Sequence, residues 1–243
     1  MKPIDCKSQS PCLTSKMAKG TEWSVLSPEE FKIFNENIVC KSYDLGKTIF
    51  YEGDACKGLY VVESGLIGVR RTDAEGERIL IRLANPGDTL GYRPLLAEES
   101  HRGSAEVMQA AKVCFLPKII VRRFLIGNPG LGAQFLLRTA RELGVADERF
   151  FETVTLPARV RLINLLMGLR EHCGHIVENG SLLLDLPLTR RDIASMLGIR
   201  AESLSRVVRE IESEGLANFS GNHVTIVNPD TLLKTLNGDN RSL

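Results

Sequence analysis

The sequence predicts an α+β fold that combines an N-terminal antiparallel β-roll, a long helix and a C-terminal winged helix-turn-helix. Three observations support this prediction. Short β-rich runs alternate with glycine turns over residues 41–118, the longest helical run follows Pro129, and two short helical segments flank Gly198. Because the chain has 243 residues and 43% hydrophobic content, it can bury a substantial core, and its length suits two modest domains.

The chain divides into four segments by composition and pattern. Residues 1–22 are polar and hold two cysteines, so we expect an N-terminal arm, and residues 23–128 should form the β-roll. Residues 129–156 should form the long helix, and residues 157–243 the winged helix-turn-helix domain. Pro157 marks the joint between the last two segments because proline cannot continue a helix.

The β-roll prediction rests on the regular spacing of short strands. Turn glycines such as Gly46, Gly65 and Gly76 separate the runs, which is typical of an antiparallel roll or barrel. A helix should precede the roll after Ser27, where Ser-Pro-Glu-Glu supplies an N-cap, a proline in the first turn and early acids. The predicted strands include residues 48–51, 59–62, 66–69, 79–81 and 113–116.

Residues 188–216 predict two short helices joined by a sharp turn. Thr189 and Asp192 form a capping-box pattern at the start of the first helix, and Gly198 can adopt the positive φ that the turn needs. The second helix should cover residues 201–214, and a short hairpin, the wing, should follow over residues 218–227. The predicted inward side chains are Ile193, Ala194, Leu197, Leu204, Val207, Val208 and Ile211.

The outward face of the second helix carries Glu202, Ser205 and Arg206 near its N-terminus. A helix laid in the major groove of DNA presents such residues to base edges, because arginine can contact guanine N7 and O6 and glutamate can accept from cytosine N4. The alternative is a solvated face with an ordinary intrahelical Glu–Arg pair. Residues 189–209 hold five arginines against two acids, a local basic patch in a chain of net charge +1. The candidate DNA-binding residues are Thr189, Arg190, Arg200, Glu202, Ser205 and Arg206.

The long helix carries an apolar stripe suited to a dimer interface. Leu136, Leu143 and Phe150 fall seven residues apart, with Ala140 between the first two, as in helices that pair with a copy of themselves. The alternative is that this stripe packs on the chain's own β-roll. We prefer a twofold dimer because a protein that reads a palindrome needs two reading heads about 34–36 Å apart.

Several function classes are disfavoured. The N-terminus lacks the apolar core of a secretory signal, and no apolar run approaches the roughly 18 residues of a membrane span, so we expect a cytoplasmic protein without a membrane partner. The four histidines are scattered, and no nucleophile–base–orienter pattern or Walker-type phosphate loop is present. We therefore expect that the protein is not an enzyme.

The segment LTRRDIASMLGIRAESLSRVVREIESEGL resembles the winged helix-turn-helix of the CRP/FNR family, bacterial regulators named for the cyclic-AMP receptor protein and the fumarate-and-nitrate-reduction regulator. Glu202, Ser205 and Arg206 match the family's base-reading positions, and Ser205 follows the FNR branch. The resemblance implies a homodimer on double-stranded, palindromic DNA with TTGAT-like half-sites, and RNA polymerase as a further partner. YDLGKTIFYEGDACKGLYVVESGLIGV and LANPGDTLGY resemble the family's cyclic-nucleotide-binding fold, which implies a sensor role for the β-roll.

The residues that the cyclic-AMP branch uses for its ligand are altered here. Tyr92 replaces the glutamate that binds the ribose, and Gly103-Ser104 stands where the branch has an Arg-Ser pair, with Arg102 one residue early. Loss of the arginine removes a charge-assisted contact worth roughly 1.5–3 kcal/mol, which disfavours cyclic AMP. Two alternatives remain for Tyr92 and Arg93: they line a pocket for another ligand, or they pack against the dimer helix. The candidate effector-pocket residues are Tyr92, Arg93 and Ser104.

The FNR branch also implies a metal centre, an oxygen-labile [4Fe–4S] cluster held by an N-terminal Cys-x2-Cys-x5-Cys arm and one distant cysteine. Cys6, Cys12 and Cys114 match three of these four positions, and Pro3 stands at the other. Either Asp5, Cys40 or Cys56 completes an iron–sulfur site, or there is no cluster. Because six cysteines in a reducing compartment are not expected to form structural disulfides, the remaining interpretations are thiol redox sensing and small buried side chains.

The leading hypothesis is a homodimeric, sequence-specific transcription regulator. An effector or a redox signal sensed in the N-terminal domain would change the pairing of the long helices and so reorient the two reading heads. One alternative keeps the regulator but assigns control to thiol oxidation or an unidentified small ligand. An alternative of another class is a ligand- or metal-binding module without specific DNA binding, which predicts association that does not depend on salt.

Overall fold

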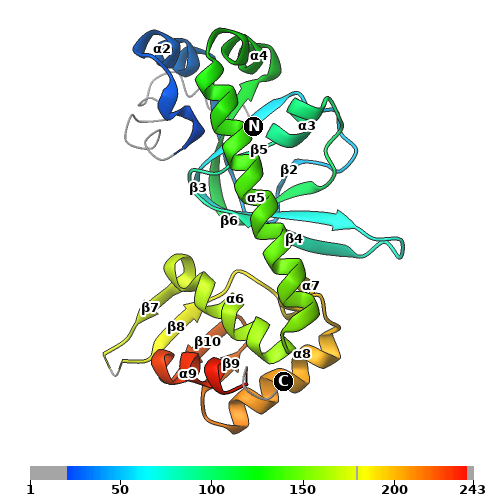
Figure 1. Ribbon diagram of the computed structural model, residues 1–243, viewed down its shortest axis with the longest axis vertical. Helices are drawn as coiled ribbons and strands as arrows, with labels where there is room; N and C mark the ends of the chain where they lie inside the picture. The colour runs from blue at the N-terminus through cyan, green and yellow to red at the C-terminus, as the bar shows by residue number, and fades with distance from the viewer. Residues whose placement is uncertain (1–20, 179, 240–243) are drawn as a thin grey trace. The chain divides into compact units, whose positions relative to one another are not determined.

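The computed structural model describes residues 21–178 and 180–239. The chain separates into two compact units, one ending at Val145 and the other beginning at Ala146. The boundary falls inside the longest helix, α5 (Pro129–Thr155), which begins at the predicted residue and ends one residue before the predicted end at residue 156 (Figure 1).

No helix in the described part of the chain is both long and apolar enough to cross a membrane.

The first unit contains the predicted antiparallel roll. Its two longest strands pair along most of their length, with Val61 opposite Cys114 and Val69 opposite Ala105. The main strand order is β1-β6-β3-β4, with β2 paired to β6 and β5 paired to β3. The strands are β1 (Val39–Tyr43), β2 (Thr48–Phe50), β3 (Gly58–Thr72), β4 (Arg78–Ala84), β5 (Thr89–Leu90) and β6 (Ser104–Pro117).

Short helices close one end of this roll. The prediction of a helix after Ser27 is confirmed: Ser27 Oγ accepts from the Glu30 amide at 3.2 Å, and the Glu30 carboxylate accepts from the Ser27 amide at 2.8 Å. This reciprocal cap satisfies two amides that a helix start leaves free. The helical elements here are η2 (Glu22–Val25), α2 (Pro28–Asn37), α3 (Tyr92–Ala97) and α4 (Lys118–Gly127).

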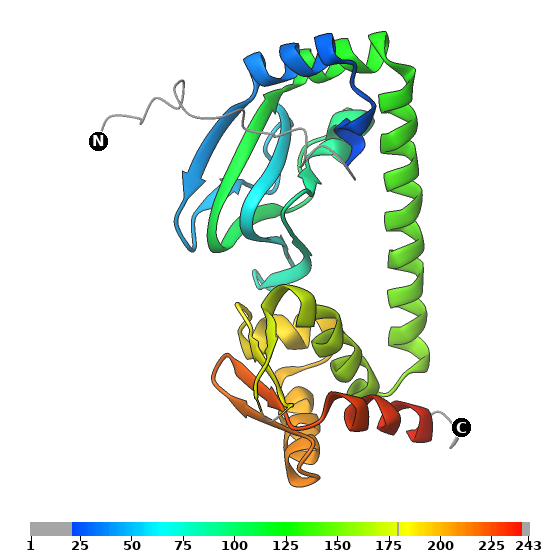
Figure 2. The ribbon, with the colours of Figure 1, turned by 90° about the vertical axis from the view of Figure 1, so that its left-hand side faces the viewer.

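An aromatic core joins these helices to α5. The rings of Trp23 and Phe34 lie 4.8 Å apart, Trp23 meets Phe135 edge-on at 5.8 Å, and Phe34 lies 6.5 Å from Phe124. These contacts hold α2 and α4 side by side and fix the start of α5 on them (Figure 2). Trp23 is the single tryptophan of the chain, so its fluorescence reports on this junction.

The second unit is the predicted winged helix-turn-helix. Its four-stranded antiparallel sheet has the order β7-β8-β10-β9, and β9 and β10 form the predicted wing. The elements that follow α5 are α6 (Ala158–Cys173), β7 (Gly174–Ile176), β8 (Leu182–Asp185), α7 (Arg190–Leu197), α8 (Ala201–Ser213), β9 (Ala217–Ser220), β10 (His223–Ile226) and α9 (Pro229–Asp239).

Two glycines of the roll share a left-handed backbone conformation but differ in how closely other atoms surround them. Gly46 and Gly65 have φ of +78° and +85°, but a Cβ on Gly46 would meet nothing within 4 Å, whereas one on Gly65 would lie 2.4 Å from the Ala110 carbonyl oxygen. We expect Gly46→Ala to cost about 1 kcal/mol of unfolding free energy through backbone strain alone. Gly65→Ala should cost roughly 3 kcal/mol because it adds overpacking. Guanidinium unfolding followed by Trp23 fluorescence measures both, and equal losses would contradict the packing argument.

Candidate functional site

The helix-turn-helix is built as its sequence pattern predicts. Thr189 Oγ1 accepts from the Asp192 amide at 3.1 Å, and the Asp192 carboxylate accepts from the Thr189 amide at 3.0 Å, so both ends of the capping box are closed. Gly198 has φ of +63°, a value that favours glycine at the turn. Arg161 of α6 donates to the Leu197 carbonyl, which fixes the end of α7.

The two helices pack through buried apolar faces. α7 buries Ile193, Ala194 and Leu197, and α8 buries Leu204, Val208 and Ile211, while Val207 is only partly buried. Because one face of α8 is committed to this core, the opposite face is directed to solvent.

That solvent face carries the three candidate base-reading side chains. Glu202, Ser205 and Arg206 are all exposed and lie within the first two turns of α8. Ser205 Oγ donates to the Ala201 carbonyl at 2.9 Å, so the hydroxyl keeps its acceptor capacity for another donor. Arg200, the N-cap residue, is exposed beside them.

The other two candidate DNA contacts have structural roles of their own. Thr189 is exposed, but its hydroxyl takes part in the cap of α7. Arg190 is half-buried, and its guanidinium lies 4.9 Å from the ring centre of Phe219 on β9, so it ties α7 to the wing.

A charged clamp that the sequence pattern did not reveal orients α8. Arg159 of α6 donates to Glu210 at 3.0 Å and, through its second nitrogen, to Glu214 at 2.6 Å. The hydrogen bond from Arg159 lowers the pKa of the Glu214 carboxyl. The partners are 51 and 55 residues apart, so only the folded arrangement of α6 and α8 brings them together.

The candidate dimer residues of α5 are open to solvent in the single chain. Leu136, Leu143 and Phe150 are 71%, 61% and 72% exposed, and Ala140 is also exposed. Within the first unit, the side of α5 that packs into the roll core carries Leu131 and Phe135, both buried, whereas Leu136 and Leu143 lie outside this core.

The first unit contains a cavity of about 450 Å³ beside α3. Its wall combines apolar side chains with four arginines and a single acid, Glu99. A cavity of this size can hold a small organic ligand. The lining residues are Phe50, Val69, Arg71, Ile81, Arg82, Leu90, Gly91, Tyr92, Arg93, Pro94, Ala97, Glu99, His101, Arg102 and Gly103.

Two of the three candidate effector-pocket residues line this cavity. Tyr92 and Arg93 also contact α5: the Tyr92 ring stacks on Phe135 at 5.9 Å, and Arg93 pairs with Glu142. The same two side chains therefore line the cavity and contact the long helix. Ser104 is not among the lining residues, because it is buried and its hydroxyl accepts from the Glu52 amide at 2.9 Å.

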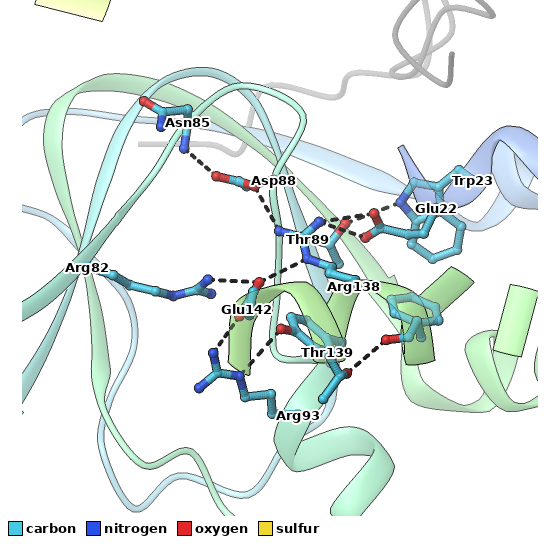
Figure 3. Close-up of polar contacts among 12 residues, drawn as sticks. Glu22, Trp23, Arg82, Asn85, Asp88, Thr89, Arg93, Arg138, Thr139 and Glu142 are labelled. Carbon is cyan, nitrogen blue, oxygen red and sulfur yellow. Dashed lines mark hydrogen bonds and ion pairs between the residues drawn. The ribbon is translucent and has the colours of Figure 1, made fainter. Parts of the chain in front are cut away.

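An ion network joins the cavity wall to α5 (Figure 3). The Glu142 carboxylate accepts from Arg82 at 3.2 Å and from Arg138 at 3.1 Å, and it also pairs with Arg93. Burial raises the pKa of the Glu142 carboxyl, but a hydrogen bond with Tyr92 and the charges of Arg82 and Arg93 outweigh it and hold the pKa at about 2. Glu142 is therefore ionised throughout the physiological pH range.

Arg138 extends this network to η2 and to the turn before β5. It donates to Glu22 at 3.0 Å and to Asp88 at 2.7 Å, and its guanidinium lies 5.3 Å from the Tyr92 ring centre. Sequence analysis missed this network because its members lie up to 116 residues apart.

The cysteines require a correction. The expectation of no structural disulfide is wrong, since Cys40 and Cys114 are bonded to each other with their Cα atoms 3.9 Å apart. The cause is strand register, because Cys40 on β1 lies directly opposite Cys114 on β6. Both are buried, and the sequence analysis named Cys40 only as one candidate to complete an iron–sulfur site with Cys114. Cys56 is a buried free thiol whose sulfur donates to the Gly58 carbonyl at 3.4 Å.

The described residues do not fit a four-thiolate iron–sulfur cluster. Cys6 and Cys12 lie outside the described residues, and the sulfur of Cys114 is already bonded to Cys40. In the described part of the chain, the ligand atoms of Cys40, Glu63 and Cys114 gather within 4.8 Å, without a fourth His, Cys, Asp or Glu. A disulfide sulfur is not a thiolate, and a cluster of this type takes four thiolates.

Comparisons with known proteins give a family match in each of the two units. A cyclic nucleotide-binding domain family matches residues 40–128, and a Crp-like helix-turn-helix domain family matches residues 160–235. The chain is 27% identical over 187 residues to the nitrogen fixation regulation protein FixK of Bradyrhizobium diazoefficiens, covering 77% of each protein. It is 27% identical over 215 residues to the transcriptional activator protein FnrL of Cereibacter sphaeroides, covering 87% of this chain and 86% of that protein.

The fold is likewise similar to a solved structure. FixK2 from Bradyrhizobium japonicum matches with a TM-score of 0.68 at 23% identity, covering 81% of this chain and 96% of the other.

Proposed function

We propose that this chain, which belongs to the CRP/FNR family of transcription regulators, binds palindromic double-stranded DNA as a homodimer and regulates transcription in the cytoplasm together with RNA polymerase. Members of this family are DNA-binding regulators rather than enzymes. The observation that carries the proposal is the exposed face of α8, where Glu202, Ser205 and Arg206 stand opposite a fully buried apolar face.

The reading mode follows from these side chains. With α8 in the major groove, Arg206 would donate to guanine N7 and O6, Glu202 would accept from cytosine N4, and Ser205 would serve either role. The resemblance of Ser205 and its neighbours to the FNR branch supports TTGAT-like half-sites, which we propose for this chain. Thr189, Arg190 and Arg200 would contact the phosphate backbone and set the register of the protein on the duplex.

The homodimer would form through α5. Leu136, Ala140, Leu143 and Phe150 repeat along one exposed stripe, and pairing with a second copy would remove this apolar surface from water. The symmetry of such a dimer matches that of a palindromic site.

Truncation of the stripe should weaken the dimer. We expect Leu143→Ala to cost about 1 kcal/mol per protomer, or about 2 kcal/mol per dimer, so that the dissociation constant rises roughly thirtyfold. Sedimentation equilibrium over a concentration series measures this change. Val145→Ala is the matched control, because Val145 is an exposed apolar residue of α5 on the opposite side of the helix. An equal effect of both variants would argue against the stripe as the interface.

The signal would reach the first unit at one of two places. The cavity next to α3 is the proposed effector site, and its contacts with α5 offer a route to the dimer helix. The Ser104 hydroxyl is bonded to the Glu52 amide and does not line the cavity, and Arg102 pairs with Glu99 at 2.9 Å. Both residues thus have other partners than a cyclic phosphate, so we do not propose cyclic AMP as the ligand.

The disulfide favours a second candidate signal, thiol oxidation. Reduction of the Cys40–Cys114 bond takes up two electrons and two protons from a dithiol, and reoxidation by a peroxide or another disulfide returns them. Because the bond joins β1 to β6, its state would change the rigidity of the roll.

The Cys40→Ala/Cys114→Ala variant should lose any redox dependence of DNA affinity. Anaerobic purification of a coloured protein containing iron and sulfide would instead favour the cluster interpretation.

Salt dependence tests the proposed function against a module that does not bind DNA specifically. We expect the affinity for a duplex with two TTGAT half-sites to fall steeply with salt, because phosphate contacts release counterions. A scrambled duplex of equal length should bind at least a thousandfold more weakly. Fluorescence anisotropy in 50–200 mM salt measures both quantities. Equal affinity for the two duplexes would overturn the proposal.

A further inference from the structure

The wall of the cavity contains two arginines whose shared partner is a carboxylate from another element. Arg82 comes from β4, Arg93 from α3, and Glu142 from α5, and the three side chains converge in Figure 3. Both arginines line the cavity, whereas Glu142 is not part of the lining. The same two cations are therefore available from the cavity on one side and from α5 on the other.

The balance of charge in the cavity favours an acidic ligand. Its wall includes Arg71, Arg82, Arg93 and Arg102 against the single acid Glu99. Arg82 and Arg93 side chains are 22% and 59% exposed, so both keep surface that a ligand can contact. Arginine pairs with carboxylate and phosphate oxygens through parallel hydrogen bonds, which makes a pair of arginines selective for an oxyanion.

The rest of the wall indicates the body of that ligand. The His101 ring stacks on Phe50 at a centroid distance of 3.8 Å, and burial lowers the pKa of His101, so this stack is uncharged at neutral pH. With Val69, Ile81 and Leu90, it forms an apolar surface inside the cavity. Such a surface suits a flat apolar or aromatic group joined to the acidic one.

We propose that Arg82 and Arg93 form an oxyanion site for a small aromatic or apolar acid, and that Glu142 of α5 occupies this site as an internal substitute when the ligand is absent. This inference rests on the proposed function and names the ligand class and the switch for its effector cavity. An incoming phosphate or carboxylate takes Arg82 and Arg93 from Glu142, which keeps Arg138 as its partner. Ligand binding thereby releases Glu142 of α5 from Arg82 of β4 and from Arg93 of α3.

Protonation does not release Glu142 from Arg82 and Arg93, so its release requires a second anion that binds the two arginines. Its pKa of about 2 keeps the carboxylate charged in the cell. Arg138 also remains in place, since it holds Glu22 and Asp88 in addition to Glu142. The release is therefore confined to the contacts that Glu142 makes with Arg82 and Arg93.

Phenyl phosphate is a suitable probe, with phenol as its neutral counterpart. We expect Glu142→Gln to bind phenyl phosphate roughly tenfold more tightly than the unaltered protein, because the internal competitor has lost its charge. Adding Arg93→Gln or Arg82→Gln to that variant should remove the gain. Glu148→Gln, which makes the same change elsewhere on α5, should leave the affinity unchanged. Calorimetry gives the affinities, and circular dichroism together with Trp23 fluorescence verifies folding.

Two results would overturn the proposal: no gain in affinity for a folded Glu142→Gln protein, or binding of phenol as strong as that of phenyl phosphate. Arg93→Gln alone, at a largely exposed side chain, provides an independent variant and should weaken phenyl phosphate binding. Measurement of DNA binding on the same samples separates the two inferences. Loss of the phosphate effect with DNA binding intact refutes only the oxyanion site, while the reverse result refutes only the proposed function.

Discussion

Reduction of the Cys40–Cys114 disulfide is expected to lower the unfolding free energy of the first unit by about 4 kcal/mol. The two cysteines are 74 residues apart, and a cross-link that closes a loop of this length removes much of the conformational entropy of the unfolded chain. Guanidinium unfolding with and without dithiothreitol, followed by Trp23 fluorescence, measures the difference. The roll should remain folded after reduction, because most side chains in its two buried apolar clusters are not part of the disulfide.

A matched variant isolates the disulfide from the other cysteines. The Cys40→Ala/Cys114→Ala protein keeps Cys56 and Cys173, both free thiols, and its stability should not respond to dithiothreitol. A response in this variant equal to that of the unaltered protein would show that the stabilising bond lies elsewhere.

Arg206→Ala is expected to weaken binding to a two-half-site duplex by about 2–6 kcal/mol, since each half-site contact is worth about 1–3 kcal/mol and the dimer makes two. The loss should be largest for duplexes that carry guanine at the contacted position. Substitution of that guanine should cost the variant little, because its base-reading group has gone. Anisotropy titrations over a set of half-site variants measure both effects.

Arg209→Ala is the control for charge alone. Arg209 is exposed further along α8, where its Nε donates to the Ser205 carbonyl at 3.1 Å. Removal of this charge should weaken binding to every duplex by a similar factor and reduce the salt slope by roughly one, without changing base preference. If Arg206→Ala behaved in the same way, the assignment of Arg206 to guanine would be wrong.

Local signals explain why the helix-turn-helix could be predicted from sequence. The Thr189–Asp192 capping box, the glycine at 198 and the spacing of Leu204, Val208 and Ile211 all act within a few residues. The same holds for α2, whose start depends on Ser27 and Glu30. Short-range hydrogen bonds and helical periodicity determine these elements, so the sequence alone indicates them.

The features that sequence analysis missed depend on distant segments. Nothing near Cys40 indicates that it faces Cys114, because only the pairing of β1 with β6 sets that register. In the same way, Glu142 appears in the sequence as one acid of an amphipathic helix, and its partners Arg82 and Arg93 become visible only in the folded roll. Arg159 and Glu214 give a third example in the second unit.

The spacing of the two half-sites tests the central claim most directly. Two copies of α8 in successive major grooves require half-sites that face the same side of the duplex, one helical turn apart. Insertion of five base pairs between the TTGAT elements should reduce affinity at least a hundredfold, whereas the unaltered spacing should bind two chains per duplex. Equal affinity for both spacings, or a stoichiometry of one chain per duplex, would contradict the account.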